Sequence, residues 1–217
     1  MNSFRYSVLA LLLFPTTLLA GPTSVTAKLG TLGAGLEVTH YFTPVLSGRL
    51  GLNKFSYDFS QADDGIDYDY ELDLSTVSAL LDWHPAEGSF YLSAGIFNNA
   101  NELSSVAKPA GSYTIGNTTY PAATVGKLRG QVDFDNPAGY LGIGWGNAYD
   151  HTAGLGWAFD LGVLFQGSPE VQLTADSPLA GDPAFQADLA REEKELEDEL
   201  SNYEYYPVVS FGISYQF

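Results

Sequence analysis

The segment from Tyr205 to Phe217 alternates between apolar and small or polar side chains. Successive side chains of a strand point to opposite faces, so this alternation predicts a strand with one apolar face. Aromatic residues stand at both ends of that face and aliphatic residues between them, which is typical of a transmembrane barrel strand. A strand of a water-soluble sandwich would explain the alternation but not the large aromatic residue at its end. The apolar positions are Tyr205, Pro207, Val209, Phe211, Ile213, Tyr215 and Phe217.

The same alternation recurs along the chain and predicts an all-β fold, an antiparallel up-and-down barrel that crosses a membrane. Near Gly30 the apolar face changes phase, which indicates either a bulge in one long strand or a tight turn between two strands. A turn gives ten strands, whereas a bulge, together with omission of the weak strand 170–175, gives eight. The ten predicted strands are 23–29, 32–42, 46–58, 68–83, 90–97, 127–134, 141–146, 155–165, 170–175 and 205–217.

We prefer ten strands because they separate short turns from long loops, which is the asymmetry of bacterial barrels. The apolar face also changes within two strands, near Lys54, where aromatic residues follow, and near Ser75. The expected periplasmic turns are 43–45, 84–89, 135–138 and 166–169. The expected extracellular loops are 60–67, 98–123, 147–153 and 176–203.

The N-terminal segment 1–20 predicts a secretory signal peptide. Arg5 precedes the short apolar run Val8–Phe14, and Ala20 offers a small residue for cleavage. No other apolar run approaches the ~18 residues that a membrane-spanning helix needs. Only helices and closed barrels satisfy their backbone hydrogen bonds within lipid. We therefore expect residues 21–217 to form one outer-membrane barrel domain.

The composition and the positions of the histidines limit the partners and activities that we expect. The net charge of −17 argues against nucleic acid as a partner, because phosphate binding needs Lys and Arg. His40 falls on the predicted lipid face, His84 in a turn and His151 in a loop, so none stands beside an inward serine and acid as a catalytic triad requires. The acids from Asp63 to Glu71 lack the spacing of a calcium loop. We expect no catalytic, cofactor-binding or metal-binding residue; a lipid A-modifying hydrolase is the enzymatic alternative.

Charged residues also fall on the inward face of the predicted strands. An isolated buried charge is very costly, so charges inside a narrow barrel have to pair. We expect an ion-pair network that plugs the lumen; the alternative is a narrow polar path for small solutes. Gly142, Gly144 and Gly146 are expected to leave inward space for neighbouring side chains. The predicted network consists of Glu37, Arg49, Asp82, Lys127, Arg129 and Asp160.

Residues 182–202 are an acidic insertion in the last long loop and the one segment with a helical pattern. Asp182 can cap a helix, and Pro183 suits its first position. Such an acidic helix is a poor fit for a lipid surface, so we expect a solvated helix that rests a partial apolar stripe on the barrel rim. Contact with an extracellular partner, or with cations held by lipopolysaccharide, is the alternative. The stripe consists of Phe185, Leu189, Leu196 and Leu200.

The chain resembles small Gram-negative outer-membrane barrels of the OmpA/OmpX type, and most closely a branch that shares four further motifs. The resemblance implies that the terminal residues Phe211, Ile213, Tyr215 and Phe217 form the signal read by the barrel-assembly machinery. It also implies outer-membrane lipid and lipopolysaccharide as surroundings, and a structural or surface-interaction role without one fixed activity. The motifs are Lys28-Leu-Gly-Thr-Leu-Gly33, Ala79-Leu-Leu-Asp-Trp-His-Pro85, Tyr140-Leu-Gly-Ile-Gly-Trp-Gly-Asn147 and Tyr206-Pro-Val-Val209.

Overall fold

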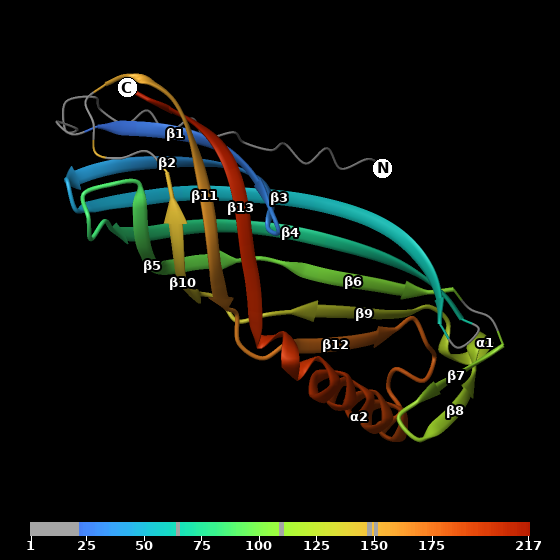
Figure 1. Ribbon diagram of the computed structural model, residues 1–217. Helices are drawn as coiled ribbons and strands as arrows, with labels where there is room; N and C mark the ends of the chain where they lie inside the picture. Colours follow the sequence, from blue (N-terminus) through green and yellow to red (C-terminus); the bar gives the residue numbers. More distant parts are fainter. Residues whose placement is uncertain (1–21, 64–65, 109–110, 147–148, 150–151) are drawn as a thin grey trace.

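One antiparallel sheet closes on itself through eight strands of the described chain (Figure 1). The computed structural model describes residues 22–63, 66–108, 111–146, 149 and 152–217, so the predicted signal peptide lies outside the described residues. The ring runs β4-β3-β2-β1-β13-β11-β10-β5 and closes where β4 pairs with β5. Its strands are β1 (Thr23–Gly30), β2 (Gly33–Thr43), β3 (Leu46–Asp63), β4 (Ile66–Trp83), β5 (Phe90–Asn99), β10 (Ala138–Trp145), β11 (Gly154–Phe165) and β13 (Tyr205–Gln216).

Three strands extend the sheet past the ring: β6 (Glu102–Ala107) on the first half of β4, β9 (Leu128–Asp133) on β6, and β12 (Glu170–Ala175) on β9. We call these strands, with the parts of β3 and β4 beyond the ring, the distal sheet. No helix in the described residues is long and apolar enough to cross a membrane. The remaining elements are β7 (Ser112–Ile115), β8 (Thr118–Pro121), α1 (Ala122–Val125), α2 (Pro183–Leu200) and the 3-10 helix η1 (Ser201–Glu204).

The ring departs from the preferred ten-strand arrangement at two segments. Residues 135–138 and 166–169 were expected to be hairpin turns, but β9 does not pair with β10, and β12 does not pair with β11. Prolines in these segments cannot donate to a ladder, so each interrupts a strand without reversing it. The predicted tight turn near Gly30 is present, since Gly30 pairs with Gly33 across Thr31 and Leu32.

Two predicted loops also have a different place. The terminal end of the ring is the end at which β1 begins and β13 ends, and the distal end is opposite. β10 ends and β11 begins at the terminal end, so the strand ends that flank residues 147–153 lie at the end of the short turns and not at the end of the long loops. Residues 147–148 and 150–151 of this connection lie outside the described residues. Residues 98–123 are not a plain loop, since they contain β6, β7 and β8.

The apolar stripes of the ring strands point outward. On β13, Phe211 and Ile213 are 56% and 62% exposed, whereas Ser210 and Ser214 are buried. On β11 the exposed residues include Trp157, and buried Asp160 lies on the opposite face. A water-soluble protein would turn such stripes toward a shared core, whereas an apolar outer wall is the arrangement of a barrel in lipid.

β3 and β4 continue past the ring with unbroken register, but their apolar side chains change face. Within the ring Leu52 pairs with Val77, and both are exposed on the outer wall. Toward the distal end Lys54 pairs with Ser75, and from Phe55 onward the aromatic residues of β3 lie on the face that continues the lining of the lumen. The outer face becomes polar at the same level. The phase changes predicted near Lys54 and Ser75 are therefore one inversion, with no bulge between the two strands.

Helix α2 rests on the distal sheet, not on the rim of the ring. Its residues Phe185 and Leu189 are buried in an apolar cluster with residues of β7, α1 and the distal sheet. The predicted cap is confirmed, because Asp182 accepts hydrogen bonds from the backbone N–H groups of Ala184 and Phe185. The N-terminal part of the helix thus covers the inner face of the distal sheet, and the C-terminal end leads through η1 into the ring strand β13.

Acidic side chains of α2 also cover the edge of β12, which is the last strand of the sheet. Glu193 accepts a hydrogen bond from the backbone N–H of Leu173 at 2.7 Å, and Glu197 accepts one from Val171 at 3.3 Å. An uncovered strand edge invites pairing with other chains. The glutamates of α2 take the place of a neighbouring strand.

Candidate functional site in the barrel interior

Arg49 on β3 lies at the centre of an ion-pair cluster inside the ring. Its Nε is 2.6 Å from Asp82 Oδ2, and its Nη1 is 2.8 Å from Asp160 Oδ1 and 3.2 Å from Glu37 Oε1. Lys28 Nζ lies 2.7 Å from the other oxygen of Glu37. Within the described residues this joins two cations to three carboxylates, and the strands β1, β2, β3, β4 and β11 are tied together across the lumen.

Uncharged side chains complete the cluster. Arg49 Nη2 donates to Ser93 Oγ at 2.9 Å, and the guanidinium lies over the ring of Tyr91, 4.8 Å from its centroid. Asp160 accepts hydrogen bonds from the Tyr91 hydroxyl at 2.9 Å and from Ser210 at 3.1 Å. Because buried charges are stable only when paired and hydrogen-bonded, these contacts are what allows the ring to enclose them.

Glycines on the inward face provide the room for the tyrosines of the lumen. A Cβ at Gly144 would lie 2.3 Å from the ring of Tyr91, and one at Gly142 would lie 2.4 Å from the Tyr140 hydroxyl. At Gly146 the nearest atom would be 3.6 Å away. The prediction that these glycines leave space for neighbours is confirmed at 142 and 144, where any other residue would collide.

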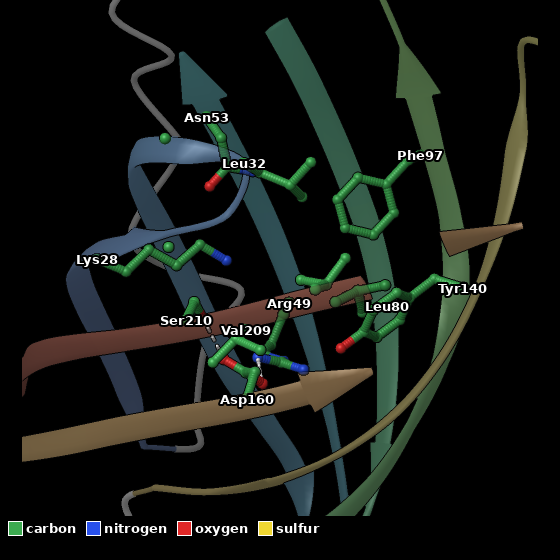
Figure 2. Close-up of a pocket in the computed structure, with 13 residues that line it drawn as sticks. Lys28, Leu32, Arg49, Asn53, Leu80, Phe97, Tyr140, Asp160, Val209 and Ser210 are labelled. Atoms are coloured by element: carbon green, nitrogen blue, oxygen red, sulfur yellow. Dashed lines mark hydrogen bonds and ion pairs between the residues drawn. The ribbon is translucent and has the colours of Figure 1, made fainter. Parts of the chain in front are cut away.

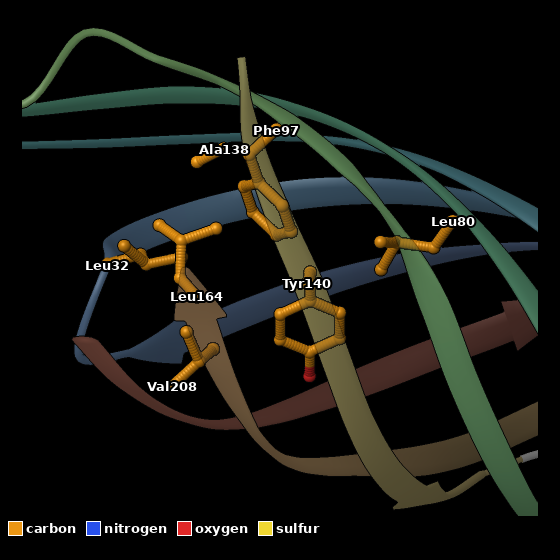
Figure 3. Packing of buried hydrophobic residues seen from close by; sticks show 7 residues of the cluster. All are labelled: Leu32, Leu80, Phe97, Ala138, Tyr140, Leu164 and Val208. Carbon is orange, nitrogen blue, oxygen red and sulfur yellow. The ribbon is translucent and has the colours of Figure 1, made fainter. Parts of the chain in front are cut away.

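An apolar plug fills the lumen on the distal side of the cluster (Figure 3). Leu32, at the turn between β1 and β2, is 4% exposed, and Phe97 packs against Tyr140 with ring centroids 5.4 Å apart. The turn is held in place because Thr31 Oγ1 donates to the carbonyl of Pro207 at 2.9 Å. The plug consists of Leu32, Leu80, Phe97, Ala138, Tyr140, Leu164 and Val208.

In the part of the lumen lined by described residues, a cavity of about 20 Å³ lies on either side of Arg49. Figure 2 shows the distal one, with Arg49, Asp160 and Ser210 gathered below Leu32 and Phe97. The cavity nearer the terminal end is lined by polar residues that include Ser47 and His84. Each has room for about one water molecule, and the Arg49 cluster stands between them.

His84 is buried at this terminal cavity, although its sequence position indicated a turn. Its Nε2 lies 3.1 Å from Ser47 Oγ, and its Nδ1 lies 3.0 Å from the carbonyl oxygen of Gly88. Asp82 contacts Ser47 at 3.4 Å and not the imidazole. In a triad the acid would orient the histidine; here a backbone carbonyl does so, and the serine is 0% exposed.

The predicted network residues divide into two groups. Glu37, Arg49, Asp82 and Asp160 are brought together in the lumen. Lys127 and Arg129 are not part of it: Lys127 precedes β9, and Arg129 on β9 forms an exposed ion pair with Asp176 at 2.8 Å. Their strand lies in the distal sheet outside the ring, so its two faces are not lumen and lipid.

Sequence reasoning missed Lys28, Tyr91, Ser93 and Ser210. In its own strand, each follows or precedes an apolar residue that points outward. The alternation therefore already indicated that each of the four points inward. Of the residues predicted as an assembly signal, Phe211, Ile213 and Tyr215 are exposed on the outer wall of β13, and Phe217, which directly follows the strand, is exposed as well.

Comparisons with known proteins concern the fold. No protein-family model matches the chain, and no curated protein sequence matches it either. The chain is similar to the crystal structure of CarO2 from Acinetobacter baumannii, with a TM-score of 0.59 and 20% identity over 90% of this chain and 98% of that chain. It is also similar to CarO from the same organism, with a TM-score of 0.57 and 22% identity over the same shares. The chain therefore has the β-barrel fold of these proteins.

Proposed function

We propose that the protein is an integral outer-membrane barrel with a structural or surface-interaction role and a closed lumen. The observation that carries this proposal is the pair of surfaces that the ring presents. Its outer wall is apolar, with Leu155 81% exposed and Ile213 62% exposed, and its interior is filled by the Arg49 cluster and the apolar plug. Lipid is the solvent that such a wall requires.

The proposal includes the surroundings and the orientation of the barrel. Outer-membrane lipid and lipopolysaccharide surround the ring, the distal sheet faces the outside of the cell, and the terminal end faces the periplasm. The resemblance to barrels of the OmpA/OmpX type supports recognition of Phe217 by the assembly machinery. Similarity to the fold of the CarO structures supports the barrel but carries no activity to this chain.

Non-enzymatic function is also part of the proposal. The Ser47–His84 contact is the arrangement closest to a lipid-modifying hydrolase, but Ser47 is 0% exposed and its cavity holds about one water. As the described residues line it, the terminal cavity is too small to admit an acyl substrate to this hydroxyl.

The proposal is tested by two measurements, the membrane in which the protein is found and the current that it conducts. Expressed with its leader in a Gram-negative host, the protein should fractionate with the outer membrane and show heat-modifiable migration on gels. Purified and inserted into a planar bilayer, it should give no steady single-channel current. Recovery in the soluble periplasmic fraction would overturn the membrane assignment, and a reproducible unitary current would overturn the closed lumen.

A narrow solute channel is the second candidate, and the two cavities on either side of Arg49 favour it. In that case the Arg49 cluster would be the constriction. Replacing the plug residue Phe97 by Ala should then raise the current. If the plug and the Arg49 cluster each close the lumen, this variant should still give no current.

A further inference from the structure

One side of β3 has no partner strand beyond the ring. β2 pairs with β3 only as far as Lys54, opposite Ala34, while β4 follows β3 on its other side up to Asp63. In the described chain no other strand pairs with β3, and Phe55, Ser56, Tyr57 and Asp58 are all exposed. An edge of this kind presents a row of unpaired backbone N–H and C=O groups, ready to receive an extended chain.

The inner face beside this edge carries a continuous row of aromatic rings. Ring centroids are 6.3 Å apart from Phe55 to Tyr57, 5.9 Å from Tyr57 to Phe59, and 5.0 Å from Phe59 to Tyr70 on β4. Phe55 remains 43% exposed and Tyr57 56% exposed. Rings held in line by each other lose little freedom on binding, so they offer preorganised apolar contact area.

The outer face beside the edge is acidic and short of cations. Asp58 lies directly opposite Glu71, and like charges in opposite positions destabilise a strand pair. Among the described residues neither has an ion-pair partner, whereas the neighbouring Asp69 has Lys108 at 2.8 Å. A basic side chain on an added strand would lie beside Asp58 and would bring positive charge toward Glu71 on the next strand.

We propose that the edge of β3 from Phe55 to Ala62 binds an extended peptide segment in which apolar and basic residues alternate. Strand addition supplies the backbone hydrogen bonds. The apolar residues of the segment pack on the aromatic row, and its basic residues face Asp58 and Glu71. This inference rests on the proposed function, because it names the partner of the surface that a closed barrel would display.

The charges also argue against a second copy of this chain as the occupant. Two β3 edges in antiparallel pairing around Asp58 would bring like charges together. The chain as a whole carries a formal charge of −17. A basic partner gains from the same field that keeps copies apart.

The probe is a fluorescein-labelled octapeptide of alternating Val and Lys, titrated against the full-length protein in nanodiscs and followed by anisotropy. Two control peptides separate the contributions: alternating Val and Glu, and four Val followed by four Lys. We expect the alternating basic peptide to bind at least about tenfold more tightly than either control. Equal affinity for the block peptide would reduce the effect to charge and overturn the strand-addition proposal.

Variants locate the site. Tyr57→Ser and Asp58→Lys should each weaken binding about tenfold or more, and the matched controls Tyr203→Ser and Glu195→Lys, on exposed residues away from β3, should leave it unchanged. Heat-modifiable migration checks that each variant keeps its barrel. Hydrogen exchange should show protection of amides within residues 55–62 when the peptide is bound. Binding without this protection, or tighter binding of a peptide copied from Phe55–Ala62, would overturn the proposal.

The two proposals can fail separately. A protein that fractionates with the outer membrane and conducts no current, but does not bind the alternating peptide, leaves the proposed function standing and removes this inference. A protein that binds the peptide at β3 but does not fractionate with the outer membrane removes the proposed function and leaves the peptide site standing.

Discussion

Lys54 on β3 lies directly opposite Ser75 on β4. On the side of this pair toward the terminal end, the two strands carry their apolar side chains on the outer wall. On the side toward the distal end, they carry them on the inner face. The backbone register does not change, so a slip between the two strands does not explain the inversion. If the ring lies in a membrane as proposed, this pair marks the outer limit of the apolar band, where lipid tails give way to water on the outer face.

The level of this boundary can be measured with single cysteines, because the sequence contains none of its own. A fluorophore on Leu52→Cys should be quenched by brominated lipids, and one on Ser56→Cys should not, since Leu52 lies below the boundary and Ser56 above it on the same face. Val77→Cys and Asp73→Cys, their partners on β4, provide a matched pair. Equal quenching at both levels would place the boundary elsewhere.

Removing Arg49 should destabilise the barrel strongly. Arg49→Met leaves Asp82 and Asp160 buried without their main cation, and breaking a buried pair in this way costs about 3–5 kcal/mol. Arg129→Met is the control, because its pair with Asp176 is exposed to solvent and should contribute little. Guanidinium unfolding in detergent, followed by tryptophan fluorescence, measures both. Similar losses for the two variants would mean that the lumen cluster does not hold the strands together.

Gly144→Ala should displace the ring of Tyr91, because the new Cβ would lie 2.3 Å from that ring. Overpacking of this kind costs about 1–3 kcal/mol, and it should also weaken the contact from the Tyr91 hydroxyl to Asp160. Gly146→Ala, whose Cβ meets nothing closer than 3.6 Å, should be neutral in the same unfolding assay. A neutral Gly144→Ala would show that Tyr91 can move without cost.

Acid should loosen α2 from the hairpin of β7 and β8. Hydrogen bonds from Tyr120 and Thr118, with the nearby Arg191, hold the pKa of Asp188 below its ordinary value. A carboxyl whose pKa is lower in the folded state contributes stability above its unfolded pKa of about 3.9, and this is lost as the pH falls through the folded value. The protection factors of the α2 amides, which correct the exchange rate for its intrinsic pH dependence, should therefore fall as the pH drops below about 3.9.

Tyr120→Phe tests the cause of this pH dependence. Without the hydroxyl that donates to Asp188 at 2.7 Å, the folded pKa of Asp188 should lie nearer its unfolded value, so α2 should be less protected at neutral pH and the loss of protection on acidification should be smaller. The packing of the ring against Phe185 would be kept. An unchanged pH profile would assign the effect to other acids of α2.

Alternation along the strands was enough to predict the outer wall and part of the interior. It assigns a side chain to a face, which is why Arg49 and Asp160 were placed inward together although they are far apart in sequence. Which inward residues meet depends on the stagger of the strands around the ring. That quantity is absent from any single strand, so the contact between Arg49 and Tyr91 could not be derived.

The misplacement of Lys127 and Arg129 has a different physical reason. Alternation says which face a residue occupies but not whether its strand belongs to the ring. The segment 135–138 looked like a hairpin turn because it contains Asn and Pro, and a turn there would have made β9 a ring strand. Pairing of β9 with β6 and β12 decides the matter, and neither partner could be identified from composition.

The first and last ring strands, β1 and β13, are neighbours, and Ser24 pairs with Gln216. Every other neighbouring pair of ring strands is closer together in sequence. This seam joins the two ends of the described chain, so its closure carries the largest loss of chain entropy. On the proposed route to the outer membrane, an intermediate whose seam is still open would expose two unpaired strand edges and an apolar outer wall to water. A chaperone that holds the unfolded chain would then be needed to keep these surfaces from aggregating until β1 and β13 pair.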